Sequence, residues 1–362
     1  MQPSELQSHG QRSEAELSER LAWTREGAYL VTPGVYRIPL PLPFDGLRAV
    51  NVYAIEAADG LVMIDSGWVL DATKDQMERS LAQIGAGLGD IRTFLITHVH
   101  RDHYTQAIAL REMFGSRVAL GAEEKPSIDA LLGKDFRVMS AQGERLIKAG
   151  AQPLIDQMVR AGFQRPSADL GYGEPDEWIA PGQVFDLGTR TLQAIATPGH
   201  TRGHMVFADL ATGLLFAGDH VLPQITPSIS FEAAPPPLPL HDFLESLRLV
   251  RQMPDLMLLP AHGPVAPSVH ARVDQLLDHH DVRLSGIAAV LADGPLTAYQ
   301  VALAVPWTSR QRKLTDLDLI NQTLAVGETI CHLDLLVARG QVKVEPADEV
   351  LLYQPTGPAD PH

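Results

Sequence analysis

The segment THVHRDH at residues 97–103 packs three histidines and one aspartate into six positions. It follows IRTFLIT at 91–97, which has the apolar pattern of a buried strand, and precedes TQAIALREMF at 105–114, which has the pattern of a helix. The cluster is therefore expected on a strand-to-helix loop. Imidazole and carboxylate groups bind divalent metals, and on such a loop alternate side chains can turn toward two different ions. A solvated polar loop is the alternative for this segment taken alone.

Three later motifs, PGHTRGH at 198–204, AGDH at 217–220 and PAHGP at 260–264, each begin where an apolar strand pattern stops. Side chains at strand ends converge on one edge of a rigid sheet, where active sites are commonly built. The four motifs together predict a metal site formed by His98, His100, Asp102, His103, His200, Asp219 and His262.

The composition narrows the class of protein. A length of 362 residues suits one large domain and a smaller one, and a formal charge of −15 opposes non-specific binding to nucleic acid. The first 20 residues lack the apolar core of a secretory signal, and no apolar run reaches the roughly 18 residues that span a bilayer. We expect a cytoplasmic protein with no membrane partner. The single cysteine, Cys331, is expected on the buried face of a helix.

The order of the patterns predicts the domains. Residues 1–27 are polar and are expected to form a flexible tail, and residues 28–275 carry the strands and the four motifs. Short helical patterns broken by Gly and Pro at about 122–180 indicate an insertion. Residues 276–362 read as three helices followed by two short strands, a pattern typical of a winged-helix-like domain.

The motifs resemble those of the metallo-β-lactamase superfamily: an aspartate in a D-x-G turn (Asp65), H-x-H-x-D-H, a later histidine, a bridging aspartate and a final histidine. The resemblance covers roughly residues 28–275 and implies an α+β fold, the αββα sandwich. It also implies two divalent metal ions, with zinc the best match and iron or manganese compatible. The winged-helix-like tail makes the whole chain similar to the β-lactamase-like protein 2 group.

The resemblance assigns a role to each residue of the motifs. His98, His100 and His200 would hold the first metal, Asp102, His103 and His262 the second, and Asp219 would bridge them. Asp102 would also orient or shuttle a proton. Asp65 would accept a hydrogen bond from a ligand imidazole, and His204 would lie just outside the ligands.

Several aromatic residues just beyond the motifs are candidates to contact the substrate, although core packing explains each equally well: Trp68, Tyr104, His220 and Phe231. Within the insertion, Met139, Met158 and Trp178 suggest an apolar lid, and simple packing is again the alternative.

Three functions fit this sequence. The leading one is hydrolysis of a thioester, ester or lactone of a small acyl substrate by a hydroxide bound to two metals. The second is a phosphodiesterase or single-strand endoribonuclease of the β-lactamase-like protein 2 type. Against it, residues 281–362 hold six Lys and Arg and ten Asp and Glu, so we expect no nucleic-acid partner, and the tail would instead pack on the core or form a homodimer contact. The third is a redox relative, which needs iron and a flavin partner.

Overall fold

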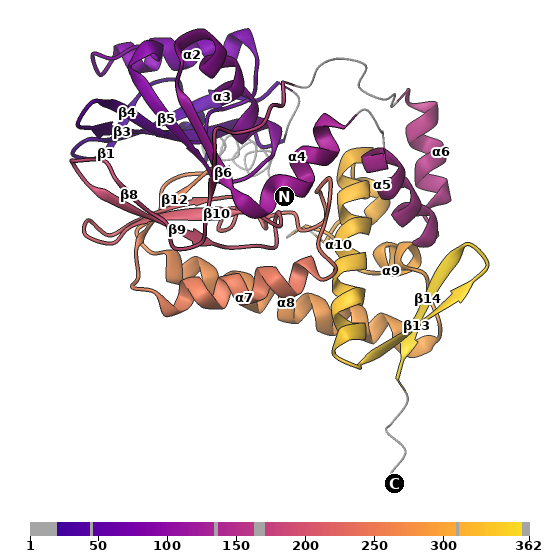
Figure 1. The fold of residues 1–362 in the computed structure, drawn as a ribbon. Helices are drawn as coiled ribbons and strands as arrows, with labels where there is room; N and C mark the ends of the chain where they lie inside the picture. Colours follow the sequence, from indigo (N-terminus) through magenta and orange to yellow (C-terminus); the bar gives the residue numbers. More distant parts are fainter. Residues whose placement is uncertain (1–19, 44–45, 134–136, 163–170, 309–310, 357–362) are drawn as a thin grey trace, which may run out of the picture.

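Two β-sheets form the centre of the computed structural model, which describes residues 20–43, 46–133, 137–162, 171–308 and 311–356, with only the backbone described at 137–141 (Figure 1). The first sheet follows the chain order: β1 (Tyr29–Thr32), β2 (Val35–Pro41), β3 (Ala49–Ala57), β4 (Gly60–Ile64), β5 (Ile91–Ile96), β6 (Arg117–Gly121) and β7 (Glu177–Ile179). Its first four strands pair antiparallel, and β4 to β7 pair parallel.

The second sheet has the order β12-β11-β10-β9-β8. Only β11 and β12 are parallel neighbours, since helix α7 (Pro239–Gln252) connects them. The strands are β8 (Val184–Asp186), β9 (Thr191–Ala196), β10 (Met205–Asp209), β11 (Leu214–Gly218) and β12 (Met257–Pro260).

Helices cover the outer face of each sheet, which makes the αββα sandwich that the sequence predicted. Helices α2 (Asp71–Ala82) and α3 (Arg101–Phe114), with the short turn η2 (Leu88–Asp90), pack on the first sheet. Helices α7 and α8 (Val269–Val290) pack on the second.

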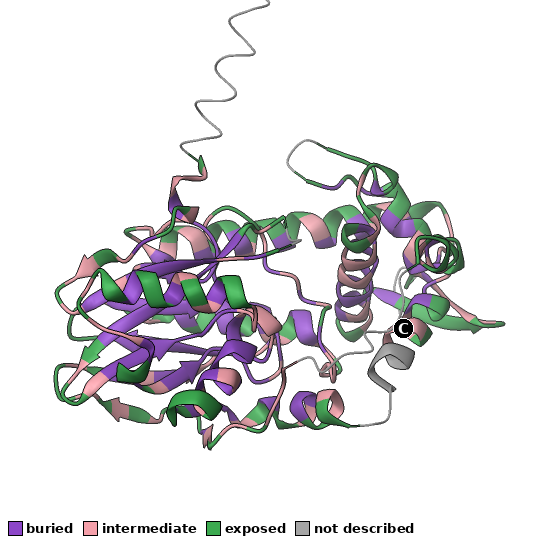
Figure 2. Cartoon of the chain, turned by 90° about the horizontal axis from the view of Figure 1, so that it is seen from above, coloured by how far each residue is buried: buried purple, intermediate pink, exposed green. Residues whose placement is uncertain are grey.

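The strands of the two sheets are largely buried (Figure 2). Side chains that alternate along them belong to different hydrophobic cores. In β3, Val52 faces the helices, whereas Tyr53 points between the sheets and meets the ring of Phe216 at 5.3 Å. In β10, Phe207 points between the sheets, and Val206 faces the other way, toward α7 and α8. The sheets are thereby locked face to face, and their strand ends are held at one edge.

The insertion packs against the C-terminal helices. It contains η3 (Ala122–Glu124), α4 (Lys125–Leu132), α5 (Arg137–Lys148) and α6 (Gln152–Arg160). Leu146 and Leu154 belong to the same core as α10 (Leu319–Ala338), and the hydroxyl of Thr323 donates to the sulfur of Met158. Met158 therefore packs on α10 instead of forming the lid suggested by the sequence. Trp178 is likewise a packing residue at the edge of the core beneath α3, and the side chain of Met139 lies outside the described residues.

The three helices and the hairpin expected at the C-terminus are present. After α8 come η4 (Leu291–Asp293), α9 (Ala298–Ala304), η5 (Leu314–Asp316), α10, β13 (Val342–Ala347) and β14 (Val350–Pro355). Cys331 is buried in α10, as predicted. The expected boundary at residue 275 falls inside α8, so one continuous helix belongs to both parts. Neither α8 nor any other helix in the described ranges is long and apolar enough to cross a membrane.

The ordered structure starts earlier than the predicted tail boundary at residue 27. A short turn, η1 (Ala22–Thr24), buries Trp23. The guanidinium of Arg37 in β2 donates to the carbonyl of Trp23 at 2.6 Å. No local sequence pattern marks this turn, because a buried arginine from a distant strand holds it.

We expect Phe207→Ala to lower the free energy of unfolding by about 3–5 kcal/mol, because the ring is fully buried between the sheets. Urea denaturation followed by circular dichroism measures the change. The control is Leu210→Ala, whose side chain is 50% exposed, with an effect below about 0.5 kcal/mol. Equal losses in both variants would contradict this assignment of the core.

Candidate metal centre

The seven predicted ligands meet at the edge of the sandwich where four strands end. His98 to His103 follow β5, and His200 lies between β9 and β10. Asp219 follows β11, and His262 follows β12. Both sheets therefore contribute to one site, and the ligands form overlapping groups whose donor atoms lie within 4.8 Å of one another.

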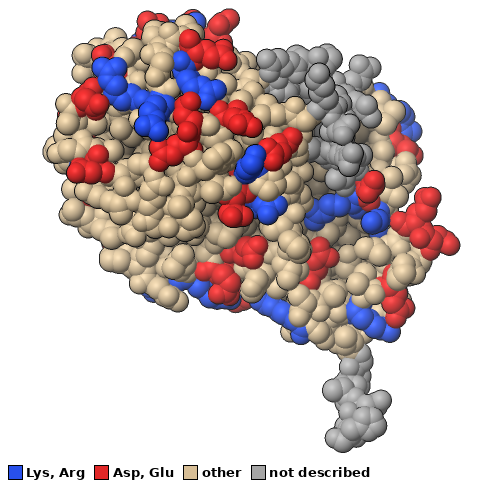
Figure 3. Space-filling model, viewed as in Figure 1, with Lys and Arg blue, Asp and Glu red and all other residues tan. Residues whose placement is uncertain are grey.

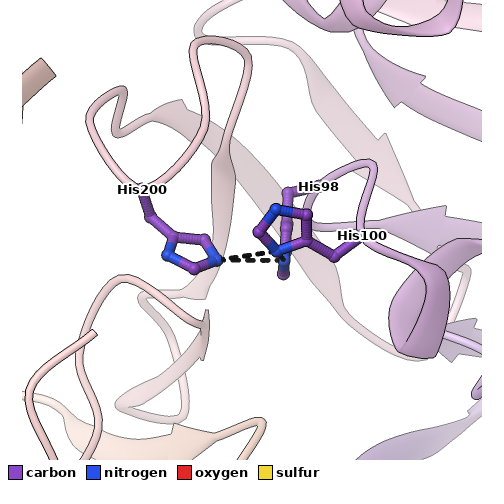
Figure 4. A group of neighbouring side chains, drawn as sticks. All are labelled: His98, His100 and His200. Carbon is purple, nitrogen blue, oxygen red and sulfur yellow. Dashed lines mark hydrogen bonds between the residues drawn. The ribbon is translucent and has the colours of Figure 1, made fainter. Parts of the chain in front are cut away.

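The first group is made of His98, His100 and His200 (Figure 4). Nε2 of His98 lies 3.0 Å from Nδ1 of His100, and Nε2 of His200 lies 3.3 Å from the former and 3.0 Å from the latter. Three imidazole ligands of one tetrahedral zinc ion, at 2.0–2.1 Å each, are separated by about 3.3 Å. The spacing of these nitrogens therefore fits a single ion.

Backbone carbonyls aim two of these rings. Nε2 of His100 donates to the carbonyl of Phe231 at 2.7 Å, which leaves Nδ1 unprotonated on the side of the group. Nδ1 of His200 donates to the carbonyl of Ser228 at 2.6 Å, which leaves Nε2 free in the same way. Since a carbonyl can only accept, these bonds fix both tautomers.

The second group is made of Asp102, His103 and His262. An oxygen of Asp102 lies 3.5 Å from Nε2 of His103 and 3.4 Å from Nε2 of His262. Nδ1 of His262 donates to the carbonyl of Ala49 at 2.8 Å, so its Nε2 is the nitrogen presented to the group. This is a second set of metal-ligand atoms beside the first.

Asp219 lies between the two groups. One of its oxygens is 3.4 Å from Nε2 of His262 and 3.7 Å from Nε2 of His103, and the other is 3.5 Å from Nε2 of His200. That first oxygen and the Nε2 atoms of His103 and His262 are buried with no hydrogen-bond partner. Buried polar atoms are normally satisfied, so these orphaned atoms fit ions bound at both groups.

Asp65 holds the loop that carries the histidine cluster. Its carboxylate accepts from Nδ1 of His103 at 2.8 Å, and from the backbone N–H and the hydroxyl of Thr97 at 2.8–3.0 Å. The same hydroxyl lies 3.0 Å from Nδ1 of His98. Asp65 has a left-handed φ of 60°, an uncommon backbone conformation of the kind that occurs at functional sites. One carboxylate thus orients ligands of both groups.

His204 fixes the backbone of Asp219. Its Nδ1 lies 2.9 Å from the hydroxyl of Thr197, and its Nε2 accepts from the N–H of Asp219 at 3.1 Å. Gly218 has a φ of 50°, and a Cβ there would lie 2.7 Å from both His204 and Thr97. The hydrogen bonds of His204 thus hold the loop of Asp219, and His204 is not a member of either group.

Comparison with known proteins agrees with this geometry. Residues 45–262 match the model of the metallo-beta-lactamase superfamily. The chain belongs to this superfamily.

Three relatives of this chain match different shares of its length. The probable metallo-hydrolase YqjP of Bacillus subtilis is 25% identical over 85% of this chain and 94% of its own length. A beta-lactamase-like protein 2 homolog of Drosophila melanogaster is 22% identical over 86% and 90%. An atrochrysone carboxyl ACP thioesterase of Aspergillus fumigatus is 30% identical over 29% of this chain and 31% of its own length.

A solved structure extends the likeness over the C-terminal region. The crystal structure of a beta-lactamase domain protein from Burkholderia ambifaria superposes with a TM-score of 0.76 and 27% sequence identity. It covers 91% of this chain and 94% of that one. The hydrolase fold of the superfamily and the helical C-terminal region therefore occur together in another protein.

The two groups of this superfamily member differ in electrostatics. Burial, and then the neighbouring imidazoles, lower the pKa of His98 and His200 well below the usual value, so the first group offers neutral lone pairs. Burial also lowers the pKa of His103, but the carboxylates of Asp102, Asp65 and Asp219 outweigh it and raise this pKa to about 10. Burial raises the pKa of Asp102, yet His103 and His262 bring it far below its usual range. The second group therefore attracts positive charge.

Two of the candidate substrate contacts are buried side chains in the structure. The ring of Tyr104 is buried beneath α3, and its hydroxyl donates to the carbonyl of Gly173 at 2.7 Å, because it points about 100° around the helix from His103. The ring of His220 is fully buried and packs 5.2 Å from Phe243 of α7, since it follows Asp219 and turns the opposite way.

The other two candidates stay at the surface near the ligands. Phe231 is 53% exposed, and its ring lies 5.7 Å from that of His100. Trp68 is partly exposed, and the guanidinium of Arg101 lies 5.1 Å from its ring. A contact of either residue with substrate stays a prediction.

Two buried carboxylates, Glu124 and Glu232, were not found from the sequence. Glu124 accepts from the N–H of Val99 and from the hydroxyl of Thr201, so it ties the loop of His98 and His100 to that of His200. Glu232 accepts from the N–H of Arg202 at 3.1 Å. Burial raises the pKa of Glu124 to about 8 and that of Glu232 to about 7. No motif surrounds either residue, since their partners come from distant segments.

Asp65→Asn is expected to weaken metal binding by about 10–100-fold, because an amide cannot accept from His103 and Thr97 together without turning its own N–H toward a donor. Competition of the protein with a chromophoric chelator measures the affinity. The control is Asp59→Asn, which makes the same exchange of a carboxylate oxygen for an amide nitrogen at an exposed turn residue. An unchanged affinity in Asp65→Asn would contradict the orienting role.

Proposed function

We propose that this protein hydrolyses a thioester, ester or lactone of a small acyl compound, with two divalent metal ions bound at the two groups. The observation that carries the proposal is the carboxylate of Asp219, which directs one oxygen to each group. When bound, such ions lower the pKa of water and polarise the scissile carbonyl. Zinc suits the His and Asp donors, and iron or manganese would use the same residues.

Asp102 is the residue proposed to handle the proton. Its side chain is 17% exposed, more than that of any other carboxylate in the two groups, and its lowered pKa keeps it ionised. An ionised carboxylate beside the reacting water can orient that water and accept its proton. His103 and His262 hold one oxygen of Asp102, so its direction is set before the substrate arrives.

Two further observations support an acyl substrate. A relative of this chain is named as a thioesterase that acts on an acyl carrier protein, although the match covers 31% of that relative. The overall charge of −15 also favours a small substrate over a polyanion.

An endoribonuclease or phosphodiesterase is the second candidate, because the Drosophila melanogaster relative named beta-lactamase-like protein 2 homolog matches 86% of this chain. Nucleic-acid binding by the C-terminal region would need a basic surface. On the face drawn in Figure 3, Lys and Arg are interspersed with Asp and Glu instead of forming a continuous band. We therefore rank this function second, and we propose packing or homodimer contact as the role of the winged-helix-like region.

Asp102→Ala and His200→Ala are each expected to reduce turnover at least about 1000-fold while leaving the circular dichroism spectrum unchanged, because both remove a group that acts on the reacting water or its metal. The assay is a panel of acyl thioesters, aryl esters, lactones, a phosphodiester and single-stranded RNA. His241→Ala, at an exposed position of α7, is the control with full activity. Cleavage confined to RNA or phosphodiesters would overturn the acyl assignment.

A further inference from the structure

A cleft of about 220 Å³ opens beside the second group of ligands. His262 and Gly263 form one wall, and Gln224 and Ile225 form another. The remaining walls come from the N-terminal turn and from the loop between β2 and β3: Arg20, Leu21, Trp23, Gly46, Leu47 and Arg48. His262 belongs to both the cleft and the second group of the metal centre, so the cleft adjoins that group.

Buried hydrogen bonds fix the walls of the cleft relative to the metal centre. Arg37 bridges the carbonyl of Trp23 and the side-chain oxygen of Asn51, at 2.6 and 2.8 Å. The amide of Asn51 donates in turn to the carbonyls of Pro260 and Gly263 at 3.0 and 2.8 Å. The N-terminal turn and the loop of His262 are thus joined through two side chains that are at most 8% exposed.

An arginine also holds the wall formed by Gln224 and Ile225, through hydrogen bonds from its guanidinium. The guanidinium of Arg272 in α8 donates to the carbonyls of Leu222 and Ile225 at 2.6 and 2.8 Å. Hydrogen bonds to the backbone therefore hold the turn of Trp23, the loop of His262 and the segment of Ile225 beside the cleft, as a binding site requires.

Arg20 and Arg48 differ from these structural arginines. Both line the cleft and are exposed, and within the described part of the chain neither forms an ion pair or a side-chain hydrogen bond. Within the described residues, no aspartate or glutamate lines the cleft. In a chain with 44 acidic residues against 29 basic ones, two guanidinium groups that have no acidic partner among the described residues and lie beside a metal centre suit an anion.

The backbone at Arg48 places this residue close to a ligand of the metal centre. Arg48 has a left-handed φ of 66°, and its carbonyl accepts from the N–H of Leu42 at 3.1 Å. The next residue, Ala49, supplies the carbonyl that orients His262. The uncommon backbone conformation of Arg48 therefore lies one residue before the carbonyl of Ala49, which orients the imidazole of His262.

We propose that this cleft binds an anionic group of the substrate, a carboxylate or a phosphate, through Arg20 and Arg48. This inference rests on the proposed acyl hydrolysis and narrows its substrates to those with a negative charge near the scissile bond. The charge can lie on the acyl part or on the leaving group, and guanidinium groups bind both kinds of anion.

Three thioesters of matched size test the proposal. Butyryl-N-acetylcysteamine is neutral, glutaryl-N-acetylcysteamine carries its charge on the acyl part, and the butyryl thioester of 3-mercaptopropionate carries it on the leaving group. We expect one of the two charged substrates to have a kcat/KM at least about tenfold above that of the neutral one. The identity of the preferred substrate shows whether the bound charge lies on the acyl part or on the leaving group.

The double variant Arg20→Gln, Arg48→Asn is expected to abolish this preference by raising KM for the charged substrate about tenfold. Its kcat for the charged substrate and its kcat/KM for the neutral substrate should not change. Asn is chosen because it tolerates a positive φ. Arg339→Gln, an exposed arginine at the end of α10, removes one positive charge elsewhere and should keep the preference. A preference that survives in the double variant, or no preference while the neutral substrate is hydrolysed, would overturn the proposal.

A binding measurement separates failure of this inference from failure of the proposed hydrolysis. Calorimetric titration of the metal-loaded protein should show, in one of the pairs glutarate–butyrate and 3-mercaptopropionate–N-acetylcysteamine, at least about tenfold tighter binding of the product with the added carboxylate than of the product that lacks it. The double variant should lose that difference. Equal binding within both pairs by the original protein would reject the anion site even if no thioester is hydrolysed.

Discussion

The site depends on buried polar atoms that have no hydrogen-bond partner and that face one another at the edge of the sandwich. The Nε2 atoms of His103 and His262 and one oxygen of Asp219 are shielded from water, and nothing else in the described structure satisfies them. Leaving such atoms unpaired costs stability, and the cost is offset when a cation binds among them. The surrounding carbonyls and the carboxylate of Asp65 prevent the rings from turning to other partners.

The packing of the two sheets brings these atoms together, because each sheet contributes different side chains of the site. The first sheet brings the cluster at His98–His103, and the second brings His200, Asp219 and His262. Each group combines side chains from both sheets, so the inter-sheet core sets the distances within each group. Hydrogen bonds from Asn51 and Tyr53 of β3 to the carbonyl of Pro260 add a direct polar link between the sheets, close to the ligands.

Much of this site could be predicted from the sequence, because strand-end motifs are local patterns. The cluster after β5 needed only an apolar strand followed by metal-ligand residues. The sequence does not reveal the direction of a side chain that long-range packing decides, as for Tyr104 and His220, which turn into the cores beneath α3 and α7. Glu124 and the cleft beside His262 could not be predicted, since their partners come together only in the folded chain.

The most direct test of the two-ion centre is anomalous diffraction from crystals of the zinc-loaded protein. We expect two peaks, one among the nitrogens of His98, His100 and His200 and the other among Asp102, His103 and His262, with Asp219 contacting both. A single peak, or an ion held without Asp219, would contradict the bridged two-metal centre on which the proposed hydrolysis depends.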